Sequence, residues 1–444
     1  MRLWRTVGLA IVSLVSSFAL IFPLPLGENG VYDSDHNVVP SYESAWAEGH
    51  ALLNFHGANA VAVAPRWFLT ARHLMHGKDT NSWVNDSSGR YYVVEHHEMG
   101  HDLSLVKVDR AFRVYSELRK TTVDTNEILT IYGQSAAGGE PIYNDLGEHG
   151  GWRTAPLDHF PRLRWGQIRT TKSLPTLIQW LFRSGDSALG PNGINCAGTA
   201  TNDSGGGIFS GGQVAAITIG GNFNAYRLST NEPMASCENQ TGHLFKPDGF
   251  WQCAGNIRPV PLGTGIAVYP ALSNIFARIA PAIRLNAGGP AILSEEEGRW
   301  TDWPLEETAA SYVGGSEIPI DTSHAIEPAP QEIYRSELYL ENQPGRSLTF
   351  SAGELIRYER YRVRLHFSSG NIARAPGAAR ETVRVNGQSV TLDPYQGPTT
   401  ASEYTFYNVA PDEQDSITVS ITPANEFGNA TVSGLEIEVM PAWP

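Results

Sequence analysis

Three short stretches of the 444-residue chain carry side chains that together could perform acyl transfer. TARH ends in His73, HDLSLVKV has Asp102 second, and NDSGGG has Ser204 third. A serine hydroxyl becomes a good nucleophile when an imidazole takes its proton, and a buried carboxylate fixes the tautomer and orientation of that imidazole. The glycines at 205–207 allow a tight turn and close approach of a substrate. Backbone N–H groups beside the serine could then face a developing oxyanion.

Each of the three residues lies near an apolar run that predicts a β-strand. Apolar residues of 62–69 lead into His73, which places the histidine at an exit from strand to loop. Residues 103–108 form an apolar strand directly after Asp102, so the acid stands at the start of that strand. Ten residues after Ser204, VAAITIGG reads as a strand that ends in a glycine edge.

With these motifs in this order, residues 48–281 resemble a serine protease of the trypsin/chymotrypsin type. His73 matches the TAAH histidine of that family, Asp102 its aspartate before an apolar strand, and Ser204 its GDSGGP serine. The resemblance implies a chymotrypsin-like double β-barrel, with the three catalytic residues in the cleft between the barrels. It also implies a C-terminal helix, which the helical spacing after Pro270 supports at Leu272, Ile275, Phe276 and Ile279.

The resemblance also implies roles for residues around Ser204. The backbone N–H groups of Asn202 and Ser204 would form the oxyanion hole, with Asn202 where the family has glycine. Asparagine tolerates the left-handed backbone better than most residues. Gly198 stands where trypsin-like members carry an acid, so we expect a neutral or apolar side-chain preference. Together with Gly198, Thr218 and Gly220 would bind the substrate.

A competing motif overlaps the aspartate. His97-Glu98-Met99-Gly100-His101 is a literal HExxH, in which two histidines on one helical face bind zinc and the glutamate is the general base. The longer zinc-protease pattern fails, because Ser104 and Lys107 stand at its glycine and third histidine. The flanking segments read as strands, which argues against the helix that the motif needs. We therefore expect no metal and no cofactor, and a zinc metalloprotease is the alternative.

Length and charge limit the class of protein. The chain is long enough for two globular domains, and its 44 glycines and 28 prolines suit a turn-rich all-β protein. With 32 basic and 46 acidic residues its net charge is −14, which argues against nucleic acid or an anionic membrane as a partner.

The first residues resemble an export signal. Arg2 and Arg5 precede an apolar run over 7–22, which is short for a membrane-spanning helix. We expect a signal peptide or N-terminal anchor over 1–26, a linker or propeptide over 27–47, and a secreted, periplasmic or cell-envelope protein. Contact with a membrane is expected only if the segment is retained. One disulfide is expected among three cysteines, with the pairing open: Cys196, Cys237 and Cys253.

Residues 282–444 change character and predict a second domain. YRVRLHF at 361–367 alternates as a strand, and an Asn386-Gly387 turn between two short strands predicts a hairpin. From the NAGG opening through RVNG to SGLEIEVMP, this part resembles a malectin-like domain, a β-sandwich associated with carbohydrate binding. Three aromatic residues could stack on a sugar ring or pack in the core: Trp303, Tyr312 and Tyr395.

The sequence thus predicts an all-β protein in which a protease-like double barrel precedes a malectin-like β-sandwich. The expected function is a secreted serine endopeptidase of non-tryptic specificity, acting on protein or peptide substrates. The second domain would bind a glycan or a partner, or dock on the protease. A third hypothesis is a catalytically silent glycan-binding protein.

Overall fold

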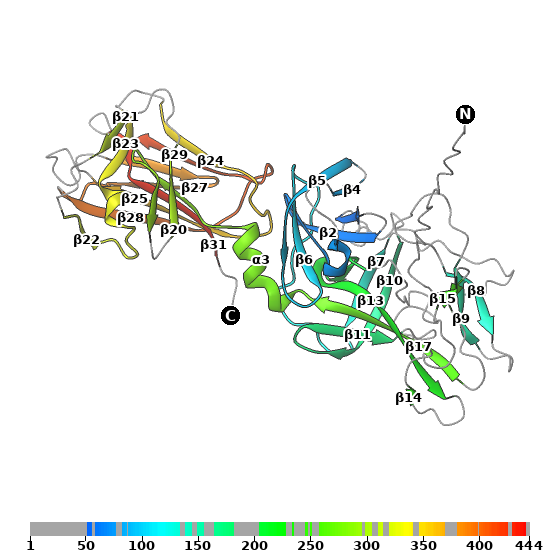
Figure 1. Cartoon of the computed structure of the whole chain (residues 1–444). Coiled ribbons are helices and arrows are strands. Elements are labelled where there is room, and N and C mark those ends of the chain that lie inside the picture. The colour runs from blue at the N-terminus through cyan, green and yellow to red at the C-terminus, as the bar shows by residue number, and fades with distance from the viewer. Residues whose placement is uncertain are drawn as a thin grey trace, which may run out of the picture. The chain divides into compact units, whose positions relative to one another are not determined.

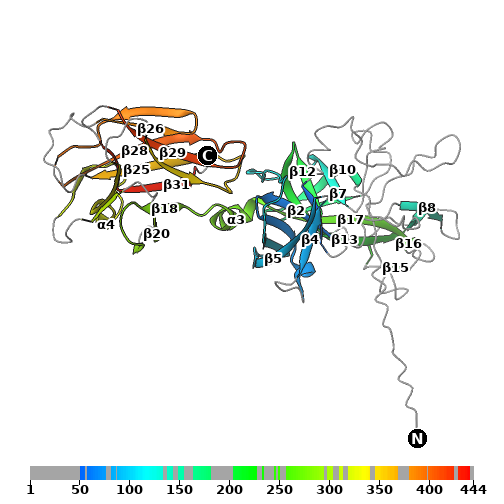
Figure 2. The same ribbon diagram turned by 90° about the horizontal axis from the view of Figure 1, so that it is seen from above.

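A computed structural model defines the fold over much of the chain (Figures 1 and 2). The residues it describes are 51–55, 58–76, 82–86, 88–133, 138–143, 149–154, 164–181, 204–227, 233–234, 245–246, 249–250, 257–294, 298–303, 310–313, 319–340, 346–368, 380–397, 399–424 and 429–440. The segments expected as signal and linker lie outside this set. The chain divides into two compact units, Met1–Ile275 and Phe276–Pro444.

Six antiparallel strands close the first barrel of the first unit, in the order β1-β2-β3-β6-β5-β4. Strands β2 and β3 are buried at every residue, and most of their side chains are apolar. The ring of Phe68 contacts Phe55 and Phe112 in this core. The six strands are β1 (Leu52–Phe55), β2 (Ala58–Ala64), β3 (Trp67–Ala71), β4 (Trp83–Asp86), β5 (Gly89–Glu98) and β6 (Leu103–Val108).

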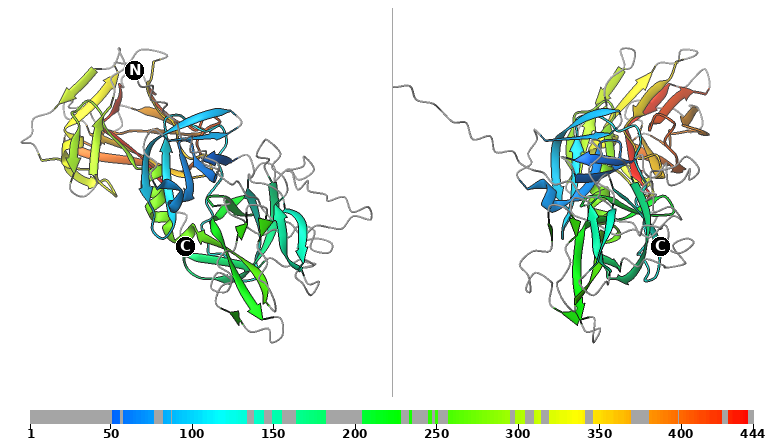
Figure 3. Two further views of the ribbon diagram at one scale, coloured as in Figure 1. Left: turned by 45° about the vertical axis from the view of Figure 1, so that its right-hand side comes forward. Right: turned by 90° about the vertical axis from the view of Figure 1, so that its right-hand side faces the viewer.

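The second barrel closes in the order β12-β7-β10-β11-β17-β13, with β13 pairing back onto β12 and β14 (Pro233–Met234) added at its edge. Figure 3 shows the first barrel in blue and the second in cyan to green. The core of the second barrel contains the fully buried side chains of Trp180, Ile131 and Ile208. The barrel strands are β7 (Ile128–Gly133), β10 (Arg164–Ser173), β11 (Leu177–Leu181), β12 (Gly207–Ser210), β13 (Gln213–Arg227) and β17 (Ile257–Ala267).

Two closed six-stranded barrels, followed by the amphipathic helix α3 (Leu272–Ile279), confirm the predicted chymotrypsin-like fold. A separate four-stranded sheet in the same unit pairs β8 (Gly138–Tyr143), β9 (His149–Thr154), β15 (Phe245–Lys246) and β16 (Gly249–Phe250). Among the residues described, no helix is both long and apolar enough to span a bilayer.

The second unit is a β-sandwich, as predicted. A seven-stranded sheet runs in the order β19-β20-β18-β31-β25-β28-β22, beside a four-stranded sheet β24-β29-β26-β27 and a three-stranded sheet β21-β23-β30. The seven strands are β18 (Ile283–Asn286), β19 (Ile292–Ser294), β20 (Gly298–Asp302), β22 (Asp321–His324), β25 (Tyr361–Ser368), β28 (Thr400–Val409) and β31 (Gly434–Val439). The others are β21 (Ala310–Val313), β23 (Ser336–Leu340), β24 (Leu348–Ala352), β26 (Glu381–Val385), β27 (Gln388–Leu392), β29 (Ile417–Pro423) and β30 (Ala430–Val432).

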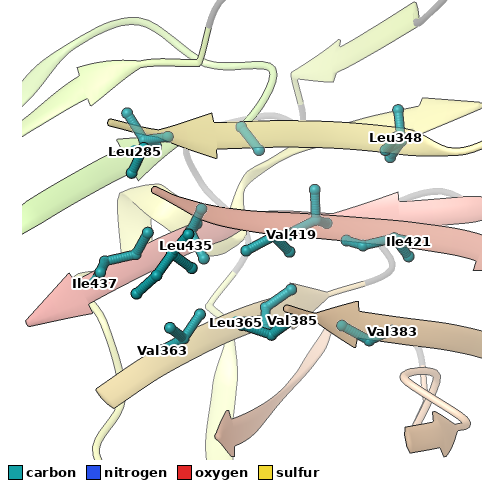
Figure 4. Packing of buried hydrophobic residues seen from close by; sticks show 14 of the residues in the cluster. Leu285, Leu348, Val363, Leu365, Val383, Val385, Val419, Ile421, Leu435 and Ile437 are labelled. Carbon is teal, nitrogen blue, oxygen red and sulfur yellow. The ribbon is translucent and has the colours of Figure 1, made fainter. Parts of the chain in front are cut away.

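The core of the sandwich lies between the large sheet and the four-stranded sheet. In Figure 4 the side chains of β25 and β31, such as Leu365 and Leu435, gather with Val385 of β26 and Val419 of β29. Alternation places these apolar residues on one face of each strand. The predicted hairpin forms between β26 and β27, with Asn386 at φ +46° in its turn.

The opposite face of the large sheet carries a buried polar network. The Tyr334 hydroxyl at the end of helix α4 (Gln331–Tyr334) accepts a hydrogen bond from the Ala329 N–H at 3.1 Å and contacts His366 Nδ1 at 2.9 Å. His366 Nε2 lies 2.8 Å from Glu436 Oε1. The side chains of Tyr334, His366 and Glu436 are all buried, so each of their polar atoms depends on a neighbouring residue for a hydrogen-bond partner.

Two of the three aromatic residues weighed as sugar-stacking platforms are buried in this unit. Trp303 is 5% exposed and its ring packs on Phe350, with centroids 5.2 Å apart, and Tyr395 is 4% exposed. Stacking on a sugar by these two residues is therefore wrong, because neither ring face is open to a ligand. The side chain of Tyr312 lies outside the described part of the chain.

Candidate active site

His73 lies where the buried strand β3 leaves the first barrel, as the sequence predicts. The strand ends at Ala71, and the 3-10 turn η1 (Arg72–Met75) follows directly. The N–H of Arg72 still donates to the Asp102 carbonyl at 2.9 Å, which continues the β3–β6 pairing past the end of the strand. The His73 side chain is 42% exposed. The backbone next to His73 is thus held by the first barrel, while the imidazole is partly exposed to solvent.

Asp102 ends a tight turn that leads from β5 into β6. Gly100 and His101 have φ values of +90° and +50°, and the Met99 N–H donates to the Leu103 carbonyl at 2.9 Å. Glycine reaches such a conformation at no steric cost. The turn brings the aspartate to the same end of the ribbon as His73, because β3 and β6 pair with Ala71 opposite Leu103.

Two hydrogen bonds join His73 to Asp102. The backbone N–H of His73 donates to Oδ1 at 2.9 Å, and Nδ1 lies 2.6 Å from Oδ2. A carboxylate oxygen accepts hydrogen bonds, so Nδ1 is the donor toward Asp102, and the neutral tautomer that fits this bond has its lone pair on Nε2. A neutral imidazole held in this tautomer is a general base whose Nε2 is ready to take a proton.

Ser204 comes from the second barrel and is held from both sides. Its carbonyl accepts a hydrogen bond from the Asn59 N–H of β2 at 3.1 Å, and its hydroxyl donates to the Ile219 carbonyl at 3.2 Å. Ile219 is the bulged residue of β13, where the register with β17 shifts between Thr218 and Gly220. A bulge re-aims the backbone, here toward the serine. The Ser204 hydroxyl is therefore hydrogen-bonded to the Ile219 carbonyl and not to His73.

The glycine after the serine is required by close approach to the first barrel, whereas the expected reason for it was a tight turn and close approach of a substrate. Gly205 has φ +85°, and a Cβ there would lie 1.8 Å from the Asn59 carbonyl oxygen and 2.5 Å from Thr70 Oγ1. No side chain fits in that space. Gly205 thereby lets the serine loop of the second barrel touch the backbone of the first.

The expected substrate-binding residues are only partly within the described chain. Thr218 is fully buried, and its N–H and carbonyl bond to the Gly206 carbonyl at 2.8 Å and the Gly205 N–H at 2.7 Å. Its hydroxyl is buried without a hydrogen-bond partner. Gly220 pairs with Thr264 on β17. The remaining expected residues lie outside the described residues: Gly198, Asn202, Cys196, Cys237 and Cys253.

The HExxH motif is not on a helix. His97 and Glu98 belong to strand β5, and His101 lies in the turn that follows. The two histidines therefore do not share a helical face, because Gly100 turns the chain into a β-hairpin. His97 Nε2 contacts Glu95 Oε1 at 2.5 Å and its ring lies 6.0 Å from that of Trp67, while Glu98 pairs with Arg72 at 3.3 Å. The motif builds the turn that carries Asp102.

Three residues at the site were not anticipated: Asn59, Thr70 and Ile219. Asn59 and Ile219 act through backbone atoms, which leave no trace in residue type. Thr70 does leave a signal, since it is a hydroxyl residue inside the otherwise apolar strand WFLTA. Its hydroxyl donates to the Asn59 carbonyl at 2.9 Å in a fully buried setting.

Comparison with known proteins gives structural likenesses only, since no protein-family model and no curated protein matches the chain. Neuropsin, a serine protease expressed in the limbic system of mouse brain, is 16% identical with a TM-score of 0.32, over 52% of this chain and 94% of that chain. Kallikrein-related peptidase 10 in complex with Zn²⁺ is 12% identical with a TM-score of 0.28, over 52% and 96%.

A second group of similar structures consists of plant receptor-like kinases. ANX2 is 15% identical with a TM-score of 0.32, over 42% of this chain and 58% of that chain. The chain thus spans less than two thirds of the length of that structure. At such scores, the assignment of the fold rests on the barrel and sandwich topology described above.

Proposed function

We propose that the chain is a serine endopeptidase that cleaves peptide bonds through His73, Asp102 and Ser204 by way of an acyl-enzyme. The observation that carries the proposal is the double hydrogen bond from His73 to Asp102, at 2.9 and 2.6 Å. It holds the imidazole in the tautomer that a serine nucleophile needs. The tie between the Asn59 N–H and the Ser204 carbonyl supports it, because it links the serine to the barrel that carries the histidine.

In the proposed reaction the Ser204 hydroxyl leaves the Ile219 carbonyl and gives its proton to His73 Nε2, while Oγ bonds to the substrate carbonyl carbon. The N–H groups of Asn202 and Ser204 would stabilise the oxyanion. The imidazolium, stabilised by Asp102, then protonates the leaving amine as the C–N bond breaks. Water repeats the sequence on the acyl-enzyme and releases the acid, which restores the serine.

The direct test is covalent labelling by a serine-directed organophosphate, combined with hydrolysis of a peptide library. Wild-type protein should be labelled at Ser204, and Ser204→Ala should lose both labelling and hydrolysis. Ser210→Ala is a matched control, because Ser210 is a nearby serine whose hydroxyl donates to Glu127 at 2.7 Å. Wild-type protein that neither labels nor hydrolyses any peptide would contradict the proposal and favour the catalytically silent glycan-binding protein.

The proposal extends to specificity, location and the second unit. Gly198 in place of an acid supports a neutral or apolar side-chain preference, and the N-terminal segment supports export to the periplasm, cell envelope or medium. The sandwich would recruit a glycan or partner to the enzyme. Library profiling should show no enrichment of Arg or Lys on the acyl side of cleaved bonds, and an enrichment there would refute the non-tryptic assignment.

A chelator and variants of the two motif histidines distinguish the zinc metalloprotease alternative from the proposed serine mechanism. Hydrolysis that survives Ser204→Ala but is lost with a chelator would support metal catalysis by His97, Glu98 and His101. The serine proposal instead expects His97→Ala and His101→Ala to keep hydrolysis, since His97 bonds to Glu95 and His101 lies in an exposed turn.

A further inference from the structure

A fully buried hydroxyl of the first barrel is linked through one residue to the backbone of the candidate nucleophile. Thr70 of β3 is 0% exposed, and its Oγ1 donates to the Asn59 carbonyl of β2 at 2.9 Å. The N–H of the same Asn59 donates to the Ser204 carbonyl at 3.1 Å. A chain of two hydrogen bonds therefore runs from Thr70, through one backbone residue, to the serine.

The close packing of Gly205 makes this chain geometrically strict. The Gly205 Cα sits so near the Asn59 carbonyl and Thr70 Oγ1 that a Cβ would clash with both, at 1.8 and 2.5 Å. The Thr70 hydroxyl and the Asn59 carbonyl thus pack directly against Gly205, the residue that follows the serine. A shift of either would be transmitted directly to Ser204.

Thr70 is also tied to the other two candidate catalytic residues through the chain. It stands three residues before His73 on β3 and pairs with Ser104, which stands two residues after Asp102 on β6. The strand that leads into the histidine thus also carries the hydroxyl that bonds to the Asn59 carbonyl. Thr70 is therefore connected both to the strand that leads into His73 and, through Asn59, to the backbone of Ser204.

We propose that Thr70 is a positioning residue of the protease site, which holds the Asn59 backbone so that its N–H fixes the Ser204 carbonyl relative to His73. The proposal rests on the proposed function, which supplies the reaction being positioned. Thr70 touches neither substrate nor reacting atoms. It acts through its hydrogen bond to Asn59 and through its close packing against Gly205.

Ser104 offers a matched control one strand away. It is paired with Thr70, is equally buried, and its hydroxyl has no hydrogen-bond partner. Ser104→Ala removes a buried hydroxyl from the same region without touching the Asn59 link. Differences between the two sites therefore report the hydrogen bond and not the loss of a buried polar group.

The test measures the acylation rate constant and the substrate dissociation constant separately, by stopped-flow with a nitrophenyl ester, in the full chain. A misplacement of about 1 Å can cost about 100-fold in rate, so Thr70→Val should slow acylation by about 10- to 100-fold with binding unchanged. Thr70→Ser should restore the rate to within about threefold, because it restores the hydroxyl. If Thr70→Val does not fold, Thr70→Ala is compared with Thr70→Ser, since these two variants differ only in the hydroxyl.

Hydrogen exchange of the Asn59 amide gives a readout that does not depend on activity. Thr70→Val should expose this amide to faster exchange, by about tenfold, while Ser104→Ala leaves it protected. Equal protection in both variants, or equal acylation rates, would overturn the positioning role. Wild-type protein that is not labelled at Ser204 would overturn the proposed function itself, and the exchange result would still decide the Asn59 link.

Discussion

Glu381 should make the sandwich lose stability as the pH rises through the neutral range. The residue begins β26 and is 1% exposed. Its Oε1 accepts hydrogen bonds from the Thr431 N–H at 2.9 Å and Oγ1 at 2.7 Å, while Oε2 is buried without a partner. Burial raises the pKa of this carboxyl from 4.5 to about 8, helped by the charges of Glu337 and Asp393 and opposed by the Thr431 hydrogen bonds.

The sign follows from proton binding. Below a pH of 4.5 the group is protonated in both states and has no effect on stability. Between 4.5 and about 8 the folded protein keeps a proton that the unfolded chain has lost, so stability falls with rising pH. At about 1.4 kcal/mol per pH unit, the cost at neutral pH is about 3 kcal/mol.

The variant Glu381→Gln keeps the acceptor for Thr431 and removes the titration. It should match wild type near pH 4 and be more stable by about 3 kcal/mol near pH 7. Hydrogen exchange of the β26 and β29 amides measures this locally in the whole chain. A wild-type pH dependence that is unchanged in Glu381→Gln would refute the reasoning, because it would show that another group binds the proton.

Three further changes test other parts of the structure. Gly205→Ala should destabilise the first unit by at least about 2 kcal/mol and abolish labelling of Ser204, since the new Cβ would lie 1.8 Å from the Asn59 carbonyl; Gly211→Ala, with φ +56° and open space around it, is the control, and equal effects in thermal unfolding would contradict the clash. Tyr334→Phe should cost about 1–3 kcal/mol in chemical denaturation of the second unit, because the Ala329 N–H and His366 Nδ1 lose their partner, whereas the exposed Tyr404→Phe should change little. Asp102→Asn should lower kcat by about 10⁴-fold in steady-state assays with the substrate KM kept, because an amide NH₂ facing Nδ1 favours the wrong imidazole tautomer; a loss under tenfold would mean that this bond does not set the tautomer.

Much of the fold could be predicted because alternation and turn residues are local signals. Residues 103–108 and 361–367 carry their strand in their own sequence, and the Asn386-Gly387 turn specifies its hairpin. The positions of His73 and Asp102 at strand ends were predictable for the same reason. The sugar-stacking hypothesis failed at Trp303 and Tyr395, because an aromatic residue has the same sequence signature in a core as on a platform.

The contacts that hold Ser204 could not be predicted, because both partners are backbone groups. The Asn59 N–H belongs to the other barrel, and the Ile219 carbonyl lies at a bulge that depends on the register of two long strands. Thr70 is the exception, since a polar residue in an apolar strand calls for a buried partner. Its partner is a backbone carbonyl that residue type does not identify.

The pairing of β3 with β6 has a consequence for how the site assembles. The base follows β3 and the acid precedes β6, and these two strands are neighbours in the first barrel, with Ala71 opposite Leu103. The pairing of the base with the acid is therefore a contact within one barrel, although β4 and β5 lie between the two strands in the chain. The nucleophile arrives from a separate barrel and is registered by the Asn59 link. The pairing of His73 with Asp102 thus depends on the structure of the first barrel, whereas the position of Ser204 relative to that pair depends on the contact between the two barrels.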